Sequence, residues 1–349
     1  MTALADLLKR QIARTGPMPL SDYVAMCLSH PDHGYYATRD PLGAAGDFTT
    51  APEISQMFGE LLGLALAQTW MDHGAPDRCI LAELGPGRGT LMSDILRATS
   101  GIPRFHQAVQ LHLIETSPVL RAAQHSRLPQ ARFHDSLASL PDGPLYLVAN
   151  EFFDALPIRQ FHRDPKGWRE VQIGKDVTAG LSAPAPIALL DHRLEDTKTG
   201  DIVEHCPALP TIIDAIATRI ARNGGAALII DYGDWRSLGD TLQALQNHAP
   251  TDPFKDPGQA DITAHVDFEA IAKAAAPAKF TRLAPQGMFL ERLGITARAQ
   301  KLEVNLSGDA LDQHIAAHRR LTHPTEMGSL FKVMGIYPDT APPPAGLEP

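Results

Sequence analysis

One acidic residue and three closely spaced glycines are the residues best placed to bind a ligand. Glu83 ends an apolar run that starts at Cys79, and Gly85, Gly87 and Gly89 follow it. In an open α/β sheet the first strand-to-helix turn contacts the ligand, and glycines there let the backbone approach it closely. We therefore predict that this turn binds a nucleoside cofactor.

The spacing of the turn separates two classes of cofactor. It reads G-x-G-x-G, and Thr90 stands where a dinucleotide-binding turn would need its third glycine. The carboxylate of Glu83 would repel a pyrophosphate, whereas S-adenosyl-L-methionine has no phosphate and carries a sulfonium and an ammonium. We expect S-adenosyl-L-methionine as the cofactor, with its cationic amino-acid half near Glu83. An NAD-dependent oxidoreductase is the alternative enzyme.

Two further acids follow the next candidate strands. Glu115 ends the apolar run at residues 111–115, and this position predicts that it binds the ribose hydroxyls. Asp135 follows a third candidate strand, where it could accept a hydrogen bond from the adenine amino group. A surface loop acid is an equally open interpretation of Asp135.

The candidate catalytic residues follow a fourth strand. Methyl transfer from a sulfonium is an in-line displacement, so an enzyme must align the nucleophile, exclude water and manage one proton. Asn150, Glu151 and Asp154 come where an open α/β sheet places its ligands. The alternative is that they cap the next helix. His265 is a further candidate base, although a single histidine is usually structural.

Residues 46–55 form a second candidate segment, with a glycine entry, two acids, hydroxyls and a rigid helix start. We expect the segment to close over the cofactor, which would be bound by Gly46, Asp47, Thr49 and Thr50. An ordinary helix start is the alternative, because Thr50 and Glu53 resemble a capping box.

Composition excludes several classes of protein. A chain of 349 residues that is 44% hydrophobic can bury a large core, and a formal net charge of −9 argues against a nonspecific nucleic-acid binder. The three cysteines and fifteen histidines show no ligand spacing, so we expect no metal. No stretch reaches the ~18 apolar residues of a membrane span and no targeting segment is evident, so we expect a cytoplasmic protein. The oligomeric state is not predicted.

The order of apolar segments predicts an α/β fold with a mostly parallel sheet. We expect a helical region at residues 1–62 that includes the cofactor-covering loop, and a core at 63–338. Accessory β and loop elements interrupt the core at about 157–206 and 234–266. The proline-rich residues 339–349 are predicted to be a disordered tail.

These segments together resemble the MidA-like family of S-adenosylmethionine-dependent methyltransferases. The matching segments cover much of the chain and are residues 33–36, 46–56, 83–90, 150–157, 261–268, 286–290, 292–295 and 326–333. The resemblance implies a class I methyltransferase fold, with a Rossmann-like seven-stranded mostly parallel sheet and an accessory region. It also implies protein arginine methylation. In mitochondrial members, which belong to the matrix, the substrate is a respiratory complex I subunit.

An arginine side chain as the methyl acceptor would explain why acidic residues follow the fourth candidate strand. A guanidinium has a pKa above 12, so it must be held by carboxylates and must lose a proton as it attacks. Glu151 and Asp154 are the preferred pair, and the sequence shows no second glutamate that would clamp the guanidinium. A noncatalytic assembly factor that uses the cofactor pocket structurally is the alternative from another class.

Overall fold

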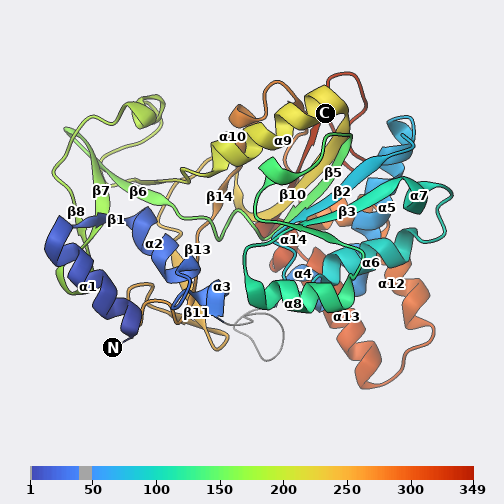
Figure 1. Cartoon of the computed structure of the whole chain (residues 1–349), viewed down its shortest axis with the longest axis horizontal. Helices are drawn as coiled ribbons and strands as arrows, with labels where there is room; N and C mark the ends of the chain where they lie inside the picture. The colour runs from blue at the N-terminus through green and yellow to red at the C-terminus, as the bar shows by residue number, and fades with distance from the viewer. Residues whose placement is uncertain (1, 39–48) are drawn as a thin grey trace. The chain divides into compact units, whose positions relative to one another are not determined.

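The computed structural model describes residues 2–38 and 49–349, which form two compact units (Figure 1). The described part of unit 1 consists of residues 2–38, Asp154–Leu209 and Asp234–Asp267. Unit 2 consists of Thr49–Phe153, Pro210–Gly233 and Phe268–Pro349.

Unit 1 combines N-terminal helices with two antiparallel sheets. Its helices are α1 (Ala3–Thr15), α2 (Leu20–Ser29) and α3 (Tyr35–Thr38), with 3-10 turns η2 (Lys175–Val177) and η3 (Ala188–Arg193). One sheet has the order β1 (Met18–Pro19), β7 (Gly167–Gly174), β6 (Arg159–Asp164), β9 (Ile202–His205), with β8 (Thr178–Leu181) on β7. The other has the order β12 (Ala249–Thr251), β11 (Gln243–Gln246), β13 (Asp261–Thr263). Strand β14 (Val266–Asp267) ends the unit.

Local sequence signals account for the first elements of unit 1. Helix α1 buries the stripe Leu4, Leu8 and Ile12, and the Thr2 side chain accepts a hydrogen bond from the backbone nitrogen of Ala5. Within the segment at about 157–206, where we expected accessory β elements, β6 and β7 pair antiparallel as a hairpin.

Unit 2 is an α/β domain built on one mixed sheet. The strand order is β15 (Lys279–Phe280), β17 (Phe331–Tyr337), β10 (Gly225–Asp234), β5 (Leu145–Asn150), β2 (Cys79–Leu84), β3 (Val109–Ile114), β4 (Arg132–His134). Neighbours from β10 to β4 are parallel, whereas β17 is antiparallel to β10, β15 and β16 (Ala284–Pro285). The predicted α/β fold is confirmed.

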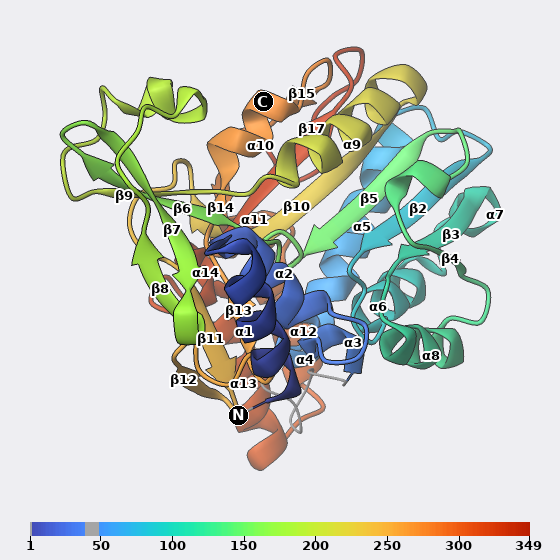
Figure 2. The same cartoon turned by 60° about the vertical axis from the view of Figure 1, so that its left-hand side comes forward.

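Helices cover both faces of this sheet (Figures 1 and 2). The N-terminal half contributes α4 (Ala51–Ile54), α5 (Gln56–Asp72), α6 (Thr90–Thr99), α7 (Phe105–Ala108), α8 (Pro118–Arg127) and the 3-10 turn η1 (Leu137–Ser139). The C-terminal half contributes α9 (Leu209–Asn223), α10 (Phe268–Ala274), α11 (Gln286–Arg292), α12 (Ile295–Glu303), α13 (Asp309–Thr322) and α14 (Met327–Leu330). Every residue of β2 and β5 is buried, as expected for strands that are covered on both faces.

The register aligns the carboxyl ends of the parallel strands. Leu84 pairs with Ile114 on one side and with Ala149 on the other, and Asn150 pairs with Ile230. Residues that follow these strands therefore emerge at the same edge of the sheet, which is where open α/β sheets bind ligands.

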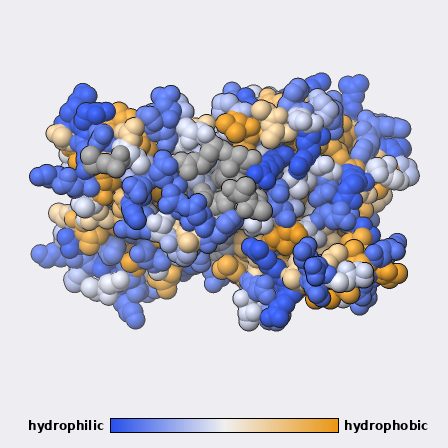
Figure 3. Space-filling model, turned by 90° about the horizontal axis from the view of Figure 1, so that it is seen from below, coloured by the Kyte–Doolittle hydropathy of each residue, from blue (hydrophilic) through white to orange (hydrophobic). Residues whose placement is uncertain are grey.

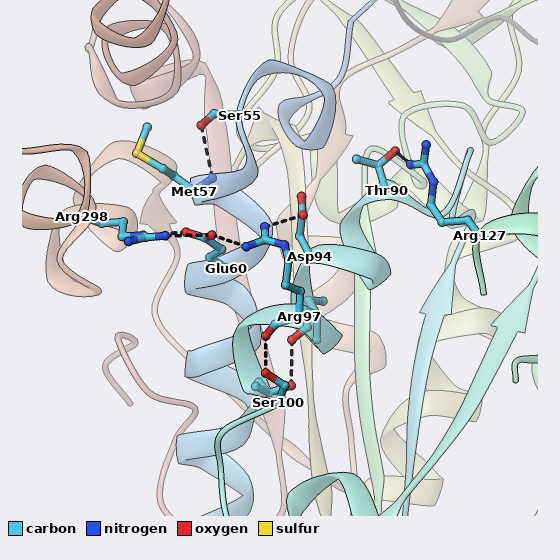
Figure 4. Close-up of polar contacts among 11 residues, drawn as sticks. Ser55, Met57, Glu60, Thr90, Asp94, Arg97, Ser100, Arg127 and Arg298 are labelled. Atoms are coloured by element: carbon cyan, nitrogen blue, oxygen red, sulfur yellow. Dashed lines mark hydrogen bonds and ion pairs between the residues drawn. The ribbon is translucent and has the colours of Figure 1, made fainter. Parts of the chain in front are cut away.

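The predicted capping box at Thr50 is wrong. Thr50 precedes α4 but makes no side-chain capping bond, and the carboxylate of Glu53 accepts a hydrogen bond from the Thr90 hydroxyl at 2.5 Å instead. Ser55 ends α4 and caps α5 through the backbone nitrogen of Met57 at 3.2 Å (Figure 4). A tertiary partner for Glu53 therefore outcompetes the local one.

The C-terminal segment packs on unit 2, which differs from the disordered tail that its composition predicted. Leu347 is buried in the main apolar cluster, the backbone nitrogen of Ala345 donates to the Thr69 hydroxyl at 3.1 Å, and Glu348 pairs with Arg292. One buried leucine and these polar contacts anchor the segment, and its prolines reduce the conformational entropy that ordering costs.

On the face that Figure 3 shows, hydrophilic residues cover most of the coloured surface, and hydrophobic residues form smaller patches. Within the described part of the chain, no helix combines the length and apolar character that crossing a bilayer requires.

Candidate functional site

The glycine turn after β2 has a backbone that only glycine adopts easily. Gly85, Gly87 and Gly89 have φ of 61°, 53° and 77°. A Cβ atom on Gly85 would lie 2.9 Å from Cδ2 of Phe152, and one on Gly89 would lie 3.1 Å from Cδ1 of Leu128. The glycines therefore serve both the turn and its close contact with neighbouring segments.

Glu83 lies at the end of β2 and is 3% exposed. Its Oε2 atom has no hydrogen-bond partner among the described residues. Burial, together with the nearby Glu115 carboxylate, raises the pKa of Glu83 to about 8. A buried carboxylate oxygen without a donor fits a site that is completed by a cationic or hydrogen-bonding ligand.

Glu115 follows β3, and both of its carboxylate oxygens accept hydrogen bonds, unlike Oε2 of Glu83. Its Oε1 accepts a hydrogen bond from the backbone nitrogen of Ser117 at 2.7 Å, and its Oε2 accepts from Nε2 of Gln124 at 3.4 Å. Burial still raises the pKa of Glu115, although these hydrogen bonds and Arg121 act in the opposite direction. The same Gln124 amide donates to the carbonyl of Gly87 at 2.7 Å, so it joins the second acid to the glycine turn.

Asn150 and Glu151 come together with the start of α4. Oε1 of Glu151 accepts from Nδ2 of Asn150 and from the backbone nitrogen of Ala51, both at 3.1 Å. Glu151 has φ of 51°, in the left-handed region, and its backbone nitrogen donates to Ile230. Such a conformation at a residue other than glycine or asparagine is uncommon and is concentrated at functional sites.

Asp231, on β10, is a residue that our sequence reasoning did not select. It is fully buried, and its Oδ2 accepts from the backbone nitrogens of Phe152 and Phe153 at 3.2 and 3.0 Å. Asp231 therefore fixes the backbone that follows Glu151. The sequence held a signal for it, because Asp231 follows an apolar run at residues 226–230 just as Glu83 ends the run that starts at Cys79.

Asp154 belongs to unit 1, where it is 6% exposed. Its carbonyl accepts from the backbone nitrogen of Ala264 at 3.0 Å. The Tyr36 hydroxyl donates to Asp261 at 2.7 Å, and the pKa of Tyr36 is raised by burial and then by the charges of Asp261 and Asp154. Unit 1 therefore gathers two buried carboxyls around one phenol, and sequence reasoning had selected only Asp154.

The remaining predicted residues have different surroundings. Gly46 and Asp47 lie outside the described residues, whereas Thr49 and Thr50 are half-buried and precede α4. Asp135 has an exposed side chain that pairs with Arg121 at 2.7 Å. The backbone nitrogen of His265 donates to the Thr241 hydroxyl at 2.8 Å, in unit 1.

Residues 2–38 and 49–349 contain no cluster of three metal-ligating side chains.

A sheet with parallel central strands, a glycine turn after β2 and buried acids at two strand ends define a nucleoside-binding α/β protein. The model of a protein family described as S-adenosyl-L-methionine-dependent methyltransferases matches residues 61–286. The chain belongs to this family of methyltransferases.

Curated relatives extend the match to nearly the whole chain. The mitochondrial protein arginine methyltransferase NDUFAF7 of Xenopus tropicalis is 36% identical, over 99% of this chain and 89% of its own length. The Homo sapiens protein of the same name is 35% identical, over 97% of this chain and 84% of its own length. A solved structure from Burkholderia thailandensis, with bound S-adenosylhomocysteine, is 28% identical over 99% of this chain and 94% of that one, with a TM-score of 0.83.

Proposed function

We propose that this chain transfers a methyl group from S-adenosyl-L-methionine to an arginine side chain of a protein substrate. The donor would be bound by Glu83, Gly85, Gly87, Gly89 and Glu115. The acceptor would be bound by Asn150, Glu151 and Asp154. The observation that carries the proposal is the buried Glu83 carboxylate, whose free oxygen lies beside a second acid at the glycine turn.

The residues at the turn suit this cofactor. The bound cofactor supplies a methyl group on a positively charged sulfur, and it also carries an ammonium. Glu83 offers that cationic half a carboxylate in a site of low dielectric, where an ion pair is stronger than in water. Glu115 offers an acceptor to the ribose hydroxyls, and the glycines admit the ligand close to the backbone.

The acids after β5 suit an arginine acceptor. A guanidinium stays protonated in water, so carboxylates must hold it and one proton must leave as its nitrogen attacks. Within unit 1, Asp261 supplies a second buried carboxyl near Asp154, as the shared effect on Tyr36 indicates. Relatives that are named protein arginine methyltransferases support this choice of acceptor.

We extend the proposal to the finer features that the family resemblance implies. These are the class I seven-stranded arrangement, cofactor contacts from Gly46, Asp47, Thr49, Thr50 and Asp135, and a respiratory complex I subunit as the substrate. Three free cysteines fit a reducing compartment such as the cytoplasm.

Mass spectrometry of methylated arginines tests the acceptor directly. Cells with and without the chain are compared, and the cells that lack it are complemented with wild type or with Glu83→Gln. We expect at least one methylarginine to be absent from cells that lack the chain. Wild type should restore it, and Glu83→Gln should not. Unchanged methylarginines would exclude the arginine assignment. If Glu83→Gln folds, binds no cofactor and still supports assembly of the partner, the function is not methyl transfer.

A further inference from the structure

Gln124, on α8, is fully buried beneath the glycine turn. Its Nε2 atom donates to the carbonyl oxygen of Gly87 at 2.7 Å and to Oε2 of Glu115 at 3.4 Å. Both N–H groups of the amide therefore point at acceptors that belong to the proposed cofactor site.

The chemistry of the neighbours fixes the orientation of this amide. If the amide were turned over, its oxygen would face a carbonyl oxygen and a carboxylate, and all three groups are acceptors. In the orientation observed, Oε1 of Gln124 has no hydrogen-bond partner among the described residues. A buried acceptor left unpaired is costly, so the two donor contacts decide how the side chain lies.

Helix α8 also packs directly against the turn. A Cβ atom on Gly89 would lie 3.7 Å from Cγ of Gln124 and 3.1 Å from Cδ1 of Leu128. At the end of the helix, Arg127 donates to the hydroxyl of Thr90, the first residue of α6. Gln124 is therefore held by packing in the position from which it reaches both acceptors.

We propose that Gln124 is a positioning residue for the methyl donor, because its amide holds the Gly87 carbonyl and the Glu115 carboxylate in one arrangement before the donor binds. The inference rests on the proposed placement of the cofactor at Glu83 and Glu115. Preorganised groups bind more tightly because the ligand does not have to order them. Gln124 itself need not contact the reacting atoms.

The pH dependence of cofactor affinity is a readout that a merely structural role of Gln124 would not change, because it depends on the charges around Glu115. The neighbours are Glu83 from β2, Arg121 from α8 and the backbone N–H groups of Thr116 and Ser117. His134, whose carbonyl accepts from the Glu115 nitrogen, has its pKa lowered by burial. Removing the Gln124 donor takes away one group that stabilises the Glu115 carboxylate, so the pKa of Glu115 rises further.

Calorimetric titration with S-adenosylhomocysteine between pH 5 and 8 measures the effect, using purified full-length wild type and Gln124→Met. Methionine keeps the approximate length of the side chain and removes both donors. We expect affinity to fall roughly 10- to 100-fold, as for loss of a hydrogen bond to a charged group. The deficit relative to wild type should grow as the pH falls, because more of the variant's Glu115 is protonated.

Gln124→Glu reverses the trend and gives a second test if the methionine variant does not fold. Its carboxylate repels Glu115 at high pH, whereas its protonated form can donate at low pH. Its deficit should therefore shrink as the pH falls.

Gln286→Met is a matched control in the same unit. Gln286 is also fully buried and donates to a backbone carbonyl, that of Leu321, at 2.9 Å. This variant should lose thermal stability but bind S-adenosylhomocysteine as wild type does at every pH. Equal affinity of Gln124→Met and wild type, or a deficit that does not depend on pH, would overturn the positioning role alone. Failure of wild type to bind would overturn the cofactor placement as well.

Discussion

Oε1 of Glu151 accepts a hydrogen bond from the backbone nitrogen of Ala51 at 3.1 Å, although the two residues are 100 positions apart in the chain. The contact attaches the segment after β5 to the first residue of α4. The same oxygen accepts from Asn150, and Asp231 holds the two backbone nitrogens that follow Glu151. The carboxylate of Glu151 is thus held by one backbone donor and one side-chain donor.

Glu151→Gln should abolish most methyl transfer while leaving the cofactor site intact. The amide keeps the size of the side chain but has no negative charge for a guanidinium and cannot take its proton. We expect methylation to fall roughly 10²- to 10⁴-fold, the range for a lost acid–base group. The checks are methylarginine levels in complemented cells and calorimetric titration with S-adenosylhomocysteine.

Glu170→Gln is the control for Glu151→Gln. Glu170 lies on β7 in unit 1, where it forms an ion pair with Arg159 at 2.7 Å. It should retain wild-type methylation. Full methylation by Glu151→Gln would remove Glu151 from the acceptor site.

Glu83 should make the unliganded protein less stable as the pH rises. Its pKa is raised from 4.5 to about 8, so the folded state holds a proton that the unfolded state releases across this window. The stability from Glu83 is complete below pH 4.5 and is lost as the pH rises through about 8. Each pKa unit corresponds to about 1.4 kcal/mol, so the effect is on the order of a few kcal/mol.

Glu83→Gln removes that titration. Urea unfolding of both proteins at pH 5, 7 and 9 should show the variant gaining stability relative to wild type as the pH rises. A difference between the two proteins that stays constant over this range would mean that Glu83 titrates normally in the folded state.

Alanine at three glycines should separate backbone strain from steric conflict. Gly74, Gly85 and Gly225 all have positive φ, but an added Cβ meets nothing within 4 Å at Gly74, Phe152 at 2.9 Å at Gly85, and the Leu145 carbonyl oxygen at 2.1 Å at Gly225. Gly74→Ala should cost about 1 kcal/mol in the free energy of unfolding, from its left-handed backbone alone.

The other two variants should differ in kind. Gly225→Ala should fail to fold, because the clash is with the backbone of a central strand. Gly85→Ala should fold but bind S-adenosylhomocysteine weakly, because the Phe152 ring must move. Thermal unfolding and calorimetry measure both effects, and equal behaviour of all three variants would contradict the steric explanation.

Loss of both arginines that hold Glu60 should cost more than the sum of the single losses. The buried Glu60 carboxylate on α5 is bound by Arg97 at 2.7 Å and by Arg298 at 2.7 and 3.1 Å (Figure 4). Burial alone would raise the pKa of Glu60, but hydrogen bonds from these arginines bring it below its usual value. Each single alanine variant leaves one partner in place.

The double variant Arg97→Ala/Arg298→Ala leaves a buried carboxylate without its cationic partners, which costs roughly 3–5 kcal/mol. A double-mutant cycle from urea unfolding at pH 7 measures the excess over additivity. Strictly additive losses would mean that the carboxylate reaches water when either arginine is removed.

The local elements were largely predictable from the sequence. The glycine turn and the acids at or just after the ends of β2 and β3 follow from backbone preferences and strand periodicity, which act over a few residues. The capping box at Thr50 failed because Thr90, distant in sequence, supplies the partner of Glu53. The disordered tail was wrong because composition does not show that Leu347 has a pocket to fill.

By itself, the sequence determined the class of cofactor, because the spacing of Gly85, Gly87 and Gly89 and the charge of Glu83 are local facts. Only the tertiary structure decided which groups hold the site: Gln124 joins the turn to Glu115, and Asp231 fixes the backbone after Glu151. These contacts depend on strand order and register, which bring distant residues to one edge of the sheet. Local propensity does not encode the strand order, because that order is selected by the pairing of distant strands and the burial of the whole core.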